Sequence, residues 1–142
     1  MSEKVLLVDD EEEFTQVLAT RLKSRGVMVD TAESGFLALN KAREQHYDAV
    51  VLDLAMPQLD GIETLRRLLA DNPDLQVIIL TGQATVEKGI EATKLGALEF
   101  LEKPADIQQL MEKIGQAKGR KVMLVEKRQE ERIKDILESR GW

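Results

Sequence analysis

Short apolar runs alternate along the chain with longer segments in which apolar residues recur at helical spacing. The runs are too short for helices and rich in β-branched residues, which is typical of strands. The five predicted strands lie at 5–8, 27–31, 48–53, 75–80 and 97–101. Helices are predicted around the apolar residues within 14–22, 36–42, 62–69, 86–95 and 107–114. Regular alternation of this kind predicts an α/β fold, a doubly wound five-stranded parallel sheet.

The run 48–53 is the most continuously apolar and is predicted to be a central strand, buried on both faces. It ends on Asp53, and Pro57 stops regular structure soon afterwards. Ligands bind open α/β sheets at the carboxyl ends of the strands, so Asp53 is expected to face a crevice. Taken alone, Asp53 is explained equally well as a loop residue that accepts hydrogen bonds from backbone N–H groups.

Other predicted strands also end on polar residues. The first is followed by Asp9 and Asp10, the fourth by Thr81 and the fifth by Lys103. Parallel strands end at one edge of a sheet, so these residues are expected to share a crevice with Asp53. Clustered carboxylates need a counter-charge, and Mg²⁺ suits them because it binds a few carboxylates together with water and phosphate oxygens. Lysine and threonine would then neutralise and hydrogen-bond a phosphoryl group carried by Asp53.

Composition narrows the classes of function. The chain has 142 residues, 43% of them hydrophobic and 32% charged, as in a soluble globular domain. Its net charge of −6 argues against binding to nucleic acid, because phosphates repel an acidic surface. The absence of cysteine excludes disulfides and thiolate metal sites. No signal peptide or long apolar span is visible, so a cytoplasmic protein without membrane contact is expected.

The strand-end residues lie in segments that resemble the receiver domain of bacterial two-component response regulators, of the stand-alone type. The segments are Val8-Asp9-Asp10-Glu11, Leu52-Asp53-Leu54-Ala55-Met56-Pro57 with Asp60-Gly61, Leu80-Thr81-Gly82, and Phe100-Leu101-Glu102-Lys103-Pro104. The resemblance covers residues 3–118, which are expected to form one receiver domain. It implies a flavodoxin-like fold with strand order 2-1-3-4-5, and a phosphoacceptor signalling domain instead of an enzyme.

The resemblance also implies roles for the acidic residues. Asp53 would accept a phosphoryl group from the phosphohistidine of a sensor histidine kinase or of a phosphotransfer protein. Asp10 and Asp53 would bind Mg²⁺ directly, together with the backbone carbonyl of Ala55, while Asp9 would act mainly through water. Ala55 has no polar side chain that could orient or block water, so the lifetime of the phosphorylated form is left open.

Lys103 matches the phosphate-contacting lysine of that family, and Thr81 and Phe100 match its switch pair. Phosphorylation is expected to draw Thr81 inward and to let the Phe100 ring turn into the vacated space. The fourth helix, weakened by Gly89, would shift in response. Output is therefore expected on the face made by the fourth helix, fifth strand and fifth helix, where an output protein or a second copy would bind.

Other classes of protein share parts of this pattern. A phosphatase with an aspartate nucleophile generally uses a general acid two residues after it, where this chain has Ala55. A flavin or nucleotide binder of the same fold needs a loop rich in Gly, Ser and Thr after the first strand. Here the acidic residues 9–13 would repel phosphate. The chain could also be part of a larger multi-domain regulator.

Residues 119–142 form a charge-rich segment after the receiver-like region. Its apolar residues, between Val122 and Leu137, form an imperfect stripe at helical spacing, which predicts a helical extension. An alternative is left open, because Lys121-Val122-Met123-Leu124-Val125-Glu126 echoes Lys4-Val5-Leu6-Leu7-Val8-Asp9. The segment could therefore begin a truncated second unit. It is too short to hold a DNA-binding domain or an output enzyme.

Overall fold

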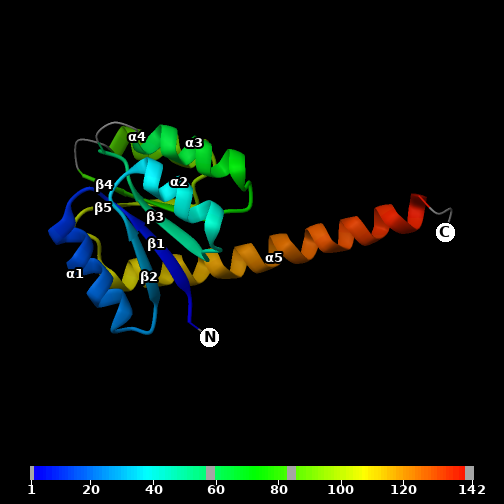
Figure 1. Cartoon of the computed structure of the whole chain (residues 1–142), viewed down its shortest axis with the longest axis horizontal. Coiled ribbons are helices and arrows are strands. Elements are labelled where there is room, and N and C mark those ends of the chain that lie inside the picture. Colours follow the sequence, from blue (N-terminus) through cyan, green and yellow to red (C-terminus); the bar gives the residue numbers. More distant parts are fainter. Residues whose placement is uncertain (1, 57–59, 83–85, 140–142) are drawn as a thin grey trace.

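The computed structural model describes residues 2–56, 60–82 and 86–139, and Pro57 lies outside these ranges. One parallel sheet with strand order β2-β1-β3-β4-β5 forms the centre of the molecule, with helices on both faces (Figure 1). Its strands are β1 (Lys4–Val8), β2 (Met28–Ala32), β3 (Ala49–Asp53), β4 (Val77–Thr81) and β5 (Glu99–Glu102). The helices are α1 (Glu12–Lys23), α2 (Gly35–Glu44), α3 (Gly61–Asp71), α4 (Val86–Lys94) and α5 (Ile107–Ser139). The predicted fold class and strand order are confirmed.

β3 is the central strand. It pairs with β1 on one side and β4 on the other, and all its residues are buried. The predicted fourth and fifth strands, in contrast, start two residues too early. Leu75 donates its N–H group to the carbonyl of Asn72, and Ala97 donates to Ala92. These bonds close the turns after α3 and α4, so the chain joins the sheet only beyond them.

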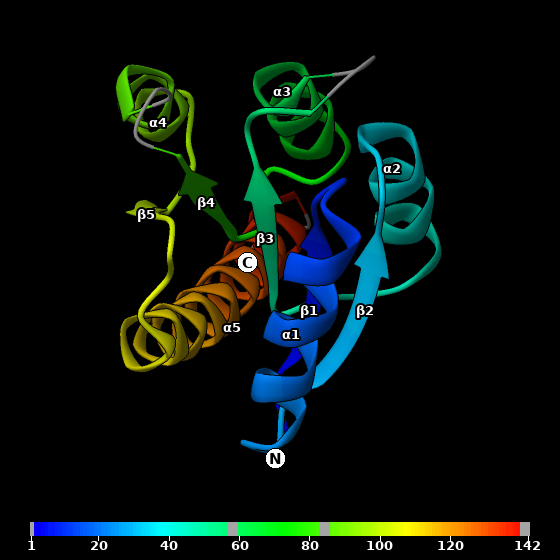
Figure 2. The same cartoon turned by 90° about the vertical axis from the view of Figure 1, so that its left-hand side faces the viewer.

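Helices cover both faces of the sheet (Figure 2), and each face has its own apolar cluster. On one face α2, α3 and α4 pack on strand residues such as Leu6, Val50 and Ile79. On the other face α1 and α5 pack on residues such as Val51 and Ile78. Successive strand residues point to opposite faces, so a continuous apolar strand serves both layers. Polar side chains of the central strands therefore gather where the strands end.

Local capping signals fix where two of the helices begin. The Ser34 hydroxyl accepts a hydrogen bond of 3.2 Å from the Leu37 N–H at the start of α2. The Asp60 carboxylate accepts one of 2.9 Å from the Glu63 N–H at the start of α3. Both caps satisfy N–H groups that the first turn of a helix leaves without an intrahelical partner. Each of these helices therefore begins one residue before its predicted apolar range.

α5 is a single helix of 33 residues that runs well beyond the sheet (Figure 1). Its first part buries Leu110, Ile114 and Ala117 against the domain. The predicted helical extension is confirmed. The alternative of a second unit that opens with a strand is wrong, because residues 121–126 are helical. The domain boundary placed after residue 118 falls inside this helix and stays a prediction.

None of the helices in the described part of the chain combines the length and the apolar character needed to cross a bilayer.

Candidate functional site

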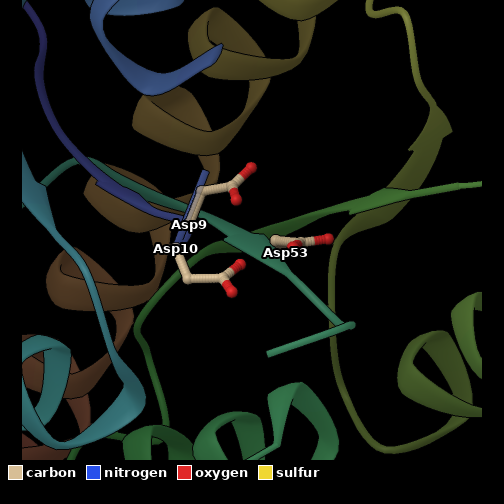
Figure 3. A group of neighbouring side chains, drawn as sticks. All are labelled: Asp9, Asp10 and Asp53. Carbon is tan, nitrogen blue, oxygen red and sulfur yellow. The ribbon is translucent and has the colours of Figure 1, made fainter. Parts of the chain in front are cut away.

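Three carboxylates gather where β1 and β3 end (Figure 3). Asp9 and Asp10 follow β1, and Asp53 is the last residue of β3. Asp9 and Asp53 are buried, with 5% and 3% of their surface exposed, whereas Asp10 is exposed. One oxygen from each lies within 4.8 Å of the others. The expected cluster at this edge of the sheet is therefore present, with one of its three members open to solvent.

Lys103 brings a positive charge into this cluster from the end of β5. Its Nζ donates a hydrogen bond of 2.9 Å to Asp9 Oδ2 and lies 3.5 Å from Asp53 Oδ1. The exposed carboxylate of Glu11 is 3.8 Å from the same nitrogen. The ammonium also lies over the ring of Phe14, 4.5 Å from its centre, at a distance suited to a cation–π contact. Lys103 is thus held on several sides, next to both buried aspartates.

Burial and charge together alter the proton affinity of these groups. Burial, together with the negative charge of Asp9, raises the pKa of Asp53 from 3.8 to about 6. The nearby charge of Lys103 and a hydrogen bond from the Ala55 N–H oppose this rise. For Lys103, burial alone would lower the pKa, but the hydrogen bond to Asp9 and the surrounding carboxylates raise it overall. Lys103 therefore stays charged at neutral pH, while Asp53 is ionised at an electrostatic cost.

Thr81 ends β4 and points a hydroxyl into the interior. Thr81 is fully buried, and its Oγ1 has no hydrogen-bond partner among the described residues. Buried polar atoms of this kind are uncommon and usually have a functional reason. On its other side, the Thr81 methyl group lies near Gly89 of α4 and the Phe100 ring of β5. A Cβ atom at Gly89 would lie 3.0 Å from two ring carbons of Phe100 and 3.1 Å from that methyl group.

Gly61 fixes the backbone just after Asp53. A Cβ atom at this position would lie 2.3 Å from the Cα of Leu54 and 2.7 Å from the carbonyl oxygen of Asp53. No side chain can be accommodated so close to another backbone. The N–H of Gly61 also donates a hydrogen bond of 3.1 Å to the carbonyl of Leu54. The first turn of α3 is thereby held directly against the end of β3, which limits how Asp53 can move.

The donor set suits a divalent cation. Carboxylate oxygens are hard ligands of the kind that Mg²⁺ prefers, and Mg²⁺ commonly uses only a few of them. Asp10 is exposed and can reach an ion from solvent, and Asp53 carries an oxygen at the same crevice. A cation here would also lower the raised pKa of Asp53 by stabilising its ionised form.

Asp9, Asp10, Asp53 and Lys103 come together where the strands end, whereas several of their neighbours were not foreseen. The sequence assigned Phe14 only to the apolar face of a helix, yet it lies beneath the ammonium of Lys103. Gly89 was interpreted as a weak point of a helix, yet it also provides room for Phe100 and Thr81. In the sequence Gly61 is marked only as part of a receiver-like segment, yet its missing side chain lets α3 approach the end of β3. No local pattern marks these roles, because each depends on residues distant in the sequence.

Comparison with known proteins agrees with this geometry. The family model of the response regulator receiver domain matches residues 5–115, most of the chain. The chain belongs to the response regulator receiver domain family. The transcriptional regulatory protein ZraR of Escherichia coli (strain K12) is 42% identical over 106 residues, which are 75% of this chain and 24% of that protein. The response regulator MprA of Mycobacterium bovis is 34% identical over 111 residues, 78% of this chain and 48% of MprA.

Solved receiver structures superpose closely on the domain. A response regulator receiver domain protein from Clostridium thermocellum is 37% identical with a TM-score of 0.83, covering 86% of this chain and 98% of that one. The receiver domain of the Francisella response regulator 1452 is 34% identical with a TM-score of 0.77, and the match covers 84% of this chain and 98% of that one. This receiver domain therefore spans about a quarter to a half of the length of the curated relatives it matches.

Proposed function

We propose that this receiver domain accepts a phosphoryl group on Asp53 from the phosphohistidine of a sensor histidine kinase or of a phosphotransfer protein. The observation that supports it best is the position of Lys103. Its ammonium lies 2.9 Å from Asp9 and 3.5 Å from Asp53, at the edge of the sheet where β1 and β3 end and three carboxylates gather. A cation site and a fixed lysine beside the buried carboxylate that ends the central strand suit the transfer of a phosphoryl group to that carboxylate.

In the proposed step an oxygen of Asp53 attacks the phosphorus atom. The P–O bond forms as the P–N bond to the kinase histidine breaks, and the released imidazole keeps the bonding electron pair. The attacking carboxylate must be ionised. Since the pKa of Asp53 is about 6, most of it is in that form at neutral pH, and its high proton affinity also favours nucleophilicity.

The other side chains would bind the transferred group. The charge of Lys103 would neutralise one phosphoryl oxygen, after exchanging part of its contact with Asp9. The Thr81 hydroxyl, which has no partner among the described residues, would donate a hydrogen bond to another. When bound, Mg²⁺ supplies positive charge that offsets the repulsion between the incoming group and the carboxylates. Asp10, Asp53 and the carbonyl of Ala55 would hold it, with Asp9 acting through water.

The proposed output begins at Thr81. When its hydroxyl moves toward the phosphoryl group, its methyl group leaves the space beside Gly89, into which the partly buried Phe100 ring can turn. The face made by α4, β5 and α5 would change shape, because the Phe100 ring of β5 lies against α4 at Gly89. Two arrangements that differ by a few kcal/mol are sufficient for such a switch. A downstream output protein, or a second copy of the chain, would bind this face.

The surroundings expected for this function are a cytoplasmic compartment and protein partners. The net charge of −6 disfavours nucleic acid as a direct ligand of this domain.

The assignment of Asp53 is tested by incubating the protein with a small phosphodonor and Mg²⁺. The wild-type chain should acquire one phosphoryl group that survives acid and is lost in base, as expected for an acyl phosphate. Asp53→Asn should acquire none, whereas Asp135→Asn, which removes an exposed carboxylate of α5, should label as the wild type does. Undiminished labelling of Asp53→Asn would sink the proposal.

The metal assignment needs a separate variant. Asp10→Asn should weaken Mg²⁺ binding and slow labelling together, since the exposed member of the cluster is lost while Asp53 and Lys103 remain. Normal labelling of Asp10→Asn at low Mg²⁺ would place the metal elsewhere.

A further inference from the structure

The extension of α5 carries a row of exposed apolar residues that the phosphoacceptor site does not use. Four apolar residues, Val122, Val125, Ile133 and Ile136, are between 41% and 58% exposed. Successive residues of an α-helix are about 100° apart around its axis. These four and Gln129 therefore fall within an arc of about 80°. We call this set, Val122, Val125, Gln129, Ile133 and Ile136, the tail stripe.

The tail stripe is separate from the surface by which the extension contacts its own domain. Lys121 donates a hydrogen bond of 2.8 Å to the carbonyl of Tyr47, and Arg128 forms a salt bridge of 2.6 Å with Asp74. Lys121 and Arg128 lie on one side of the helix, together with the buried Ala117. That side is roughly a third of a turn away from the tail stripe. The two contacts fix the rotation of the helix and leave the tail stripe uncovered by this domain.

Charged residues flank the tail stripe asymmetrically. Glu126 and Glu130 lie on one side of it, about 60° and 100° from its centre. Arg132 and Arg128 lie at the same angles on the other side. Two copies related by a two-fold axis parallel to the helices place the acidic flank of each beside the basic flank of the other. An antiparallel pair would instead oppose acid to acid and base to base, which is repulsive.

We propose that the tail stripe binds the tail stripe of a second copy of the chain, in parallel and in register. In this arrangement the apolar residues pack against their own counterparts, and Gln129 faces Gln129, where two amides can donate to and accept from one another. A single polar residue in such a seam favours one register over its alternatives. The proposal goes beyond phosphoryl transfer and does not rest on it, because the tail stripe is already exposed in the structure.

Pairing is tested on the full chain by sedimentation over a wide range of protein concentration. The wild type should dimerise, and the double variant Val125→Gln with Ile136→Gln should raise the dissociation constant about tenfold or more. Met123→Gln is the matched control. Met123 is more exposed, at 70%, but lies about 120° from the centre of the tail stripe. A wild-type chain that stays monomeric throughout, or a double variant that pairs as well as the control, overturns the proposal.

Orientation is tested by two further experiments. The chain has no cysteine, so Val122→Cys introduces a single thiol. In a parallel pair the two thiols meet and should form a disulfide under mild oxidation. In an antiparallel pair centred on Gln129, each thiol would face Ile136 and the two thiols would lie about 21 Å apart along the helix axis. Met123→Cys should cross-link far less. Equal cross-linking of the two variants contradicts a parallel seam.

The flanks give an independent test. Glu126→Lys and Arg132→Glu should each weaken self-pairing, because like charges then face one another across the seam. A mixture of the two variants should restore it, since both flanks again carry opposite charges. Unchanged pairing of either variant alone contradicts the proposed orientation. Pairing should persist in Asp53→Asn, so failure of phosphoryl transfer and failure of pairing are distinguishable.

Discussion

The phosphoacceptor site and the extension of α5 are both incompletely satisfied, but in opposite chemical senses. At the site, buried carboxylates of Asp9 and Asp53 share one ammonium, and the Thr81 hydroxyl has no partner among the described residues. Along the extension, apolar side chains are exposed to water and the charged groups are largely solvated. The first arrangement favours binding of a cation and an anionic group, and the second favours binding of another apolar surface.

The two regions also differ in how firmly they are held. Lys103 is fixed by Asp9, by the Phe14 ring and by a backbone hydrogen bond of 2.7 Å from its N–H to the carbonyl of Thr81. Beyond residue 118, a hydrogen bond from Lys121 and a salt bridge of Arg128 connect the helix to the domain. Chemistry that depends on tenths of an ångström needs the first kind of support. A surface that only has to meet a partner functions with the second.

The largest expected effect concerns the free-energy cost of keeping the buried Asp53 ionised in the folded protein. The pKa of Asp53 is about 6 in the folded protein and 3.8 in its ordinary state, so the folded state binds this proton more tightly. The free energy of unfolding therefore falls as pH rises from about 4 to about 6 through this group, and the loss reaches about 3 kcal/mol at neutral pH. Asp53→Asn cannot ionise and should be more stable than wild type by up to that amount at pH 7.

The measurement is urea unfolding at several pH values with a chelator present. The advantage of Asp53→Asn should be small at pH 4, grow up to about pH 6 and then level off. Saturating Mg²⁺ should narrow it, because a cation stabilises the ionised carboxylate of the wild type. Asp135→Asn, at an exposed position, should show no such growth. An advantage that does not vary with pH would mean that Asp53 carries no raised pKa.

Residues that end predicted strands could be inferred from the sequence, since parallel topology brings strand ends to one edge whatever the loops do. Asp9, Asp53 and Lys103 were placed together on that ground alone, and they meet. Contacts that depend on side-chain packing between distant elements could not be inferred. Phe14 beneath Lys103 and Arg128 on Asp74 have no local sequence signal.

The roles of the glycines also could not be inferred from the sequence alone. Gly89 was expected only to weaken its helix, because propensity is a property of the residue itself. Its closeness to Phe100 and Thr81 is a property of the packed fold. Likewise, glycine is intrinsically unfavourable inside a helix, yet α5 continues through Gly115 and Gly119. Burial of its apolar face against the domain outweighs the intrinsic cost, as tertiary packing commonly does.

A second variant removes the positive charge beside Asp53 and leaves the acceptor itself in place. Lys103→Met keeps the length and most of the apolar stem of the side chain but removes its charge. Labelling by a small phosphodonor should slow by about ten- to a hundredfold, since one fixed donor to the developing charge is lost. The pKa of Asp53 should also rise, because Lys103 lowers it.

A pH profile separates this effect from general damage. In the wild type the labelling rate should increase through about pH 6 as Asp53 ionises, and in Lys103→Met the increase should move to higher pH. Lys113→Met, which removes a lysine 3.2 Å from Glu99 and away from the cluster, is the control and should leave the profile in place. A slower rate with an unshifted profile would indicate that Lys103 does not act on Asp53 through its charge.

The smallest expected effect lies on the extension, where Arg128 meets Asp74. The contact has two hydrogen-bonded arms, of 2.6 and 2.9 Å, but the Arg128 side chain is 61% exposed. Solvent screens such a pair, so its coupling should be about 0.5 kcal/mol and not more than about 1 kcal/mol. A double-mutant cycle of Arg128→Ala and Asp74→Ala, measured by urea unfolding at protein concentrations where the chain is monomeric, gives this coupling directly.

High salt should reduce the coupling between Arg128 and Asp74 further, whereas the stability difference of Asp53→Asn should change much less because that carboxylate is buried. A coupling of several kcal/mol would mean that the extension is held as firmly as the site, and the contrast between the two regions would fail.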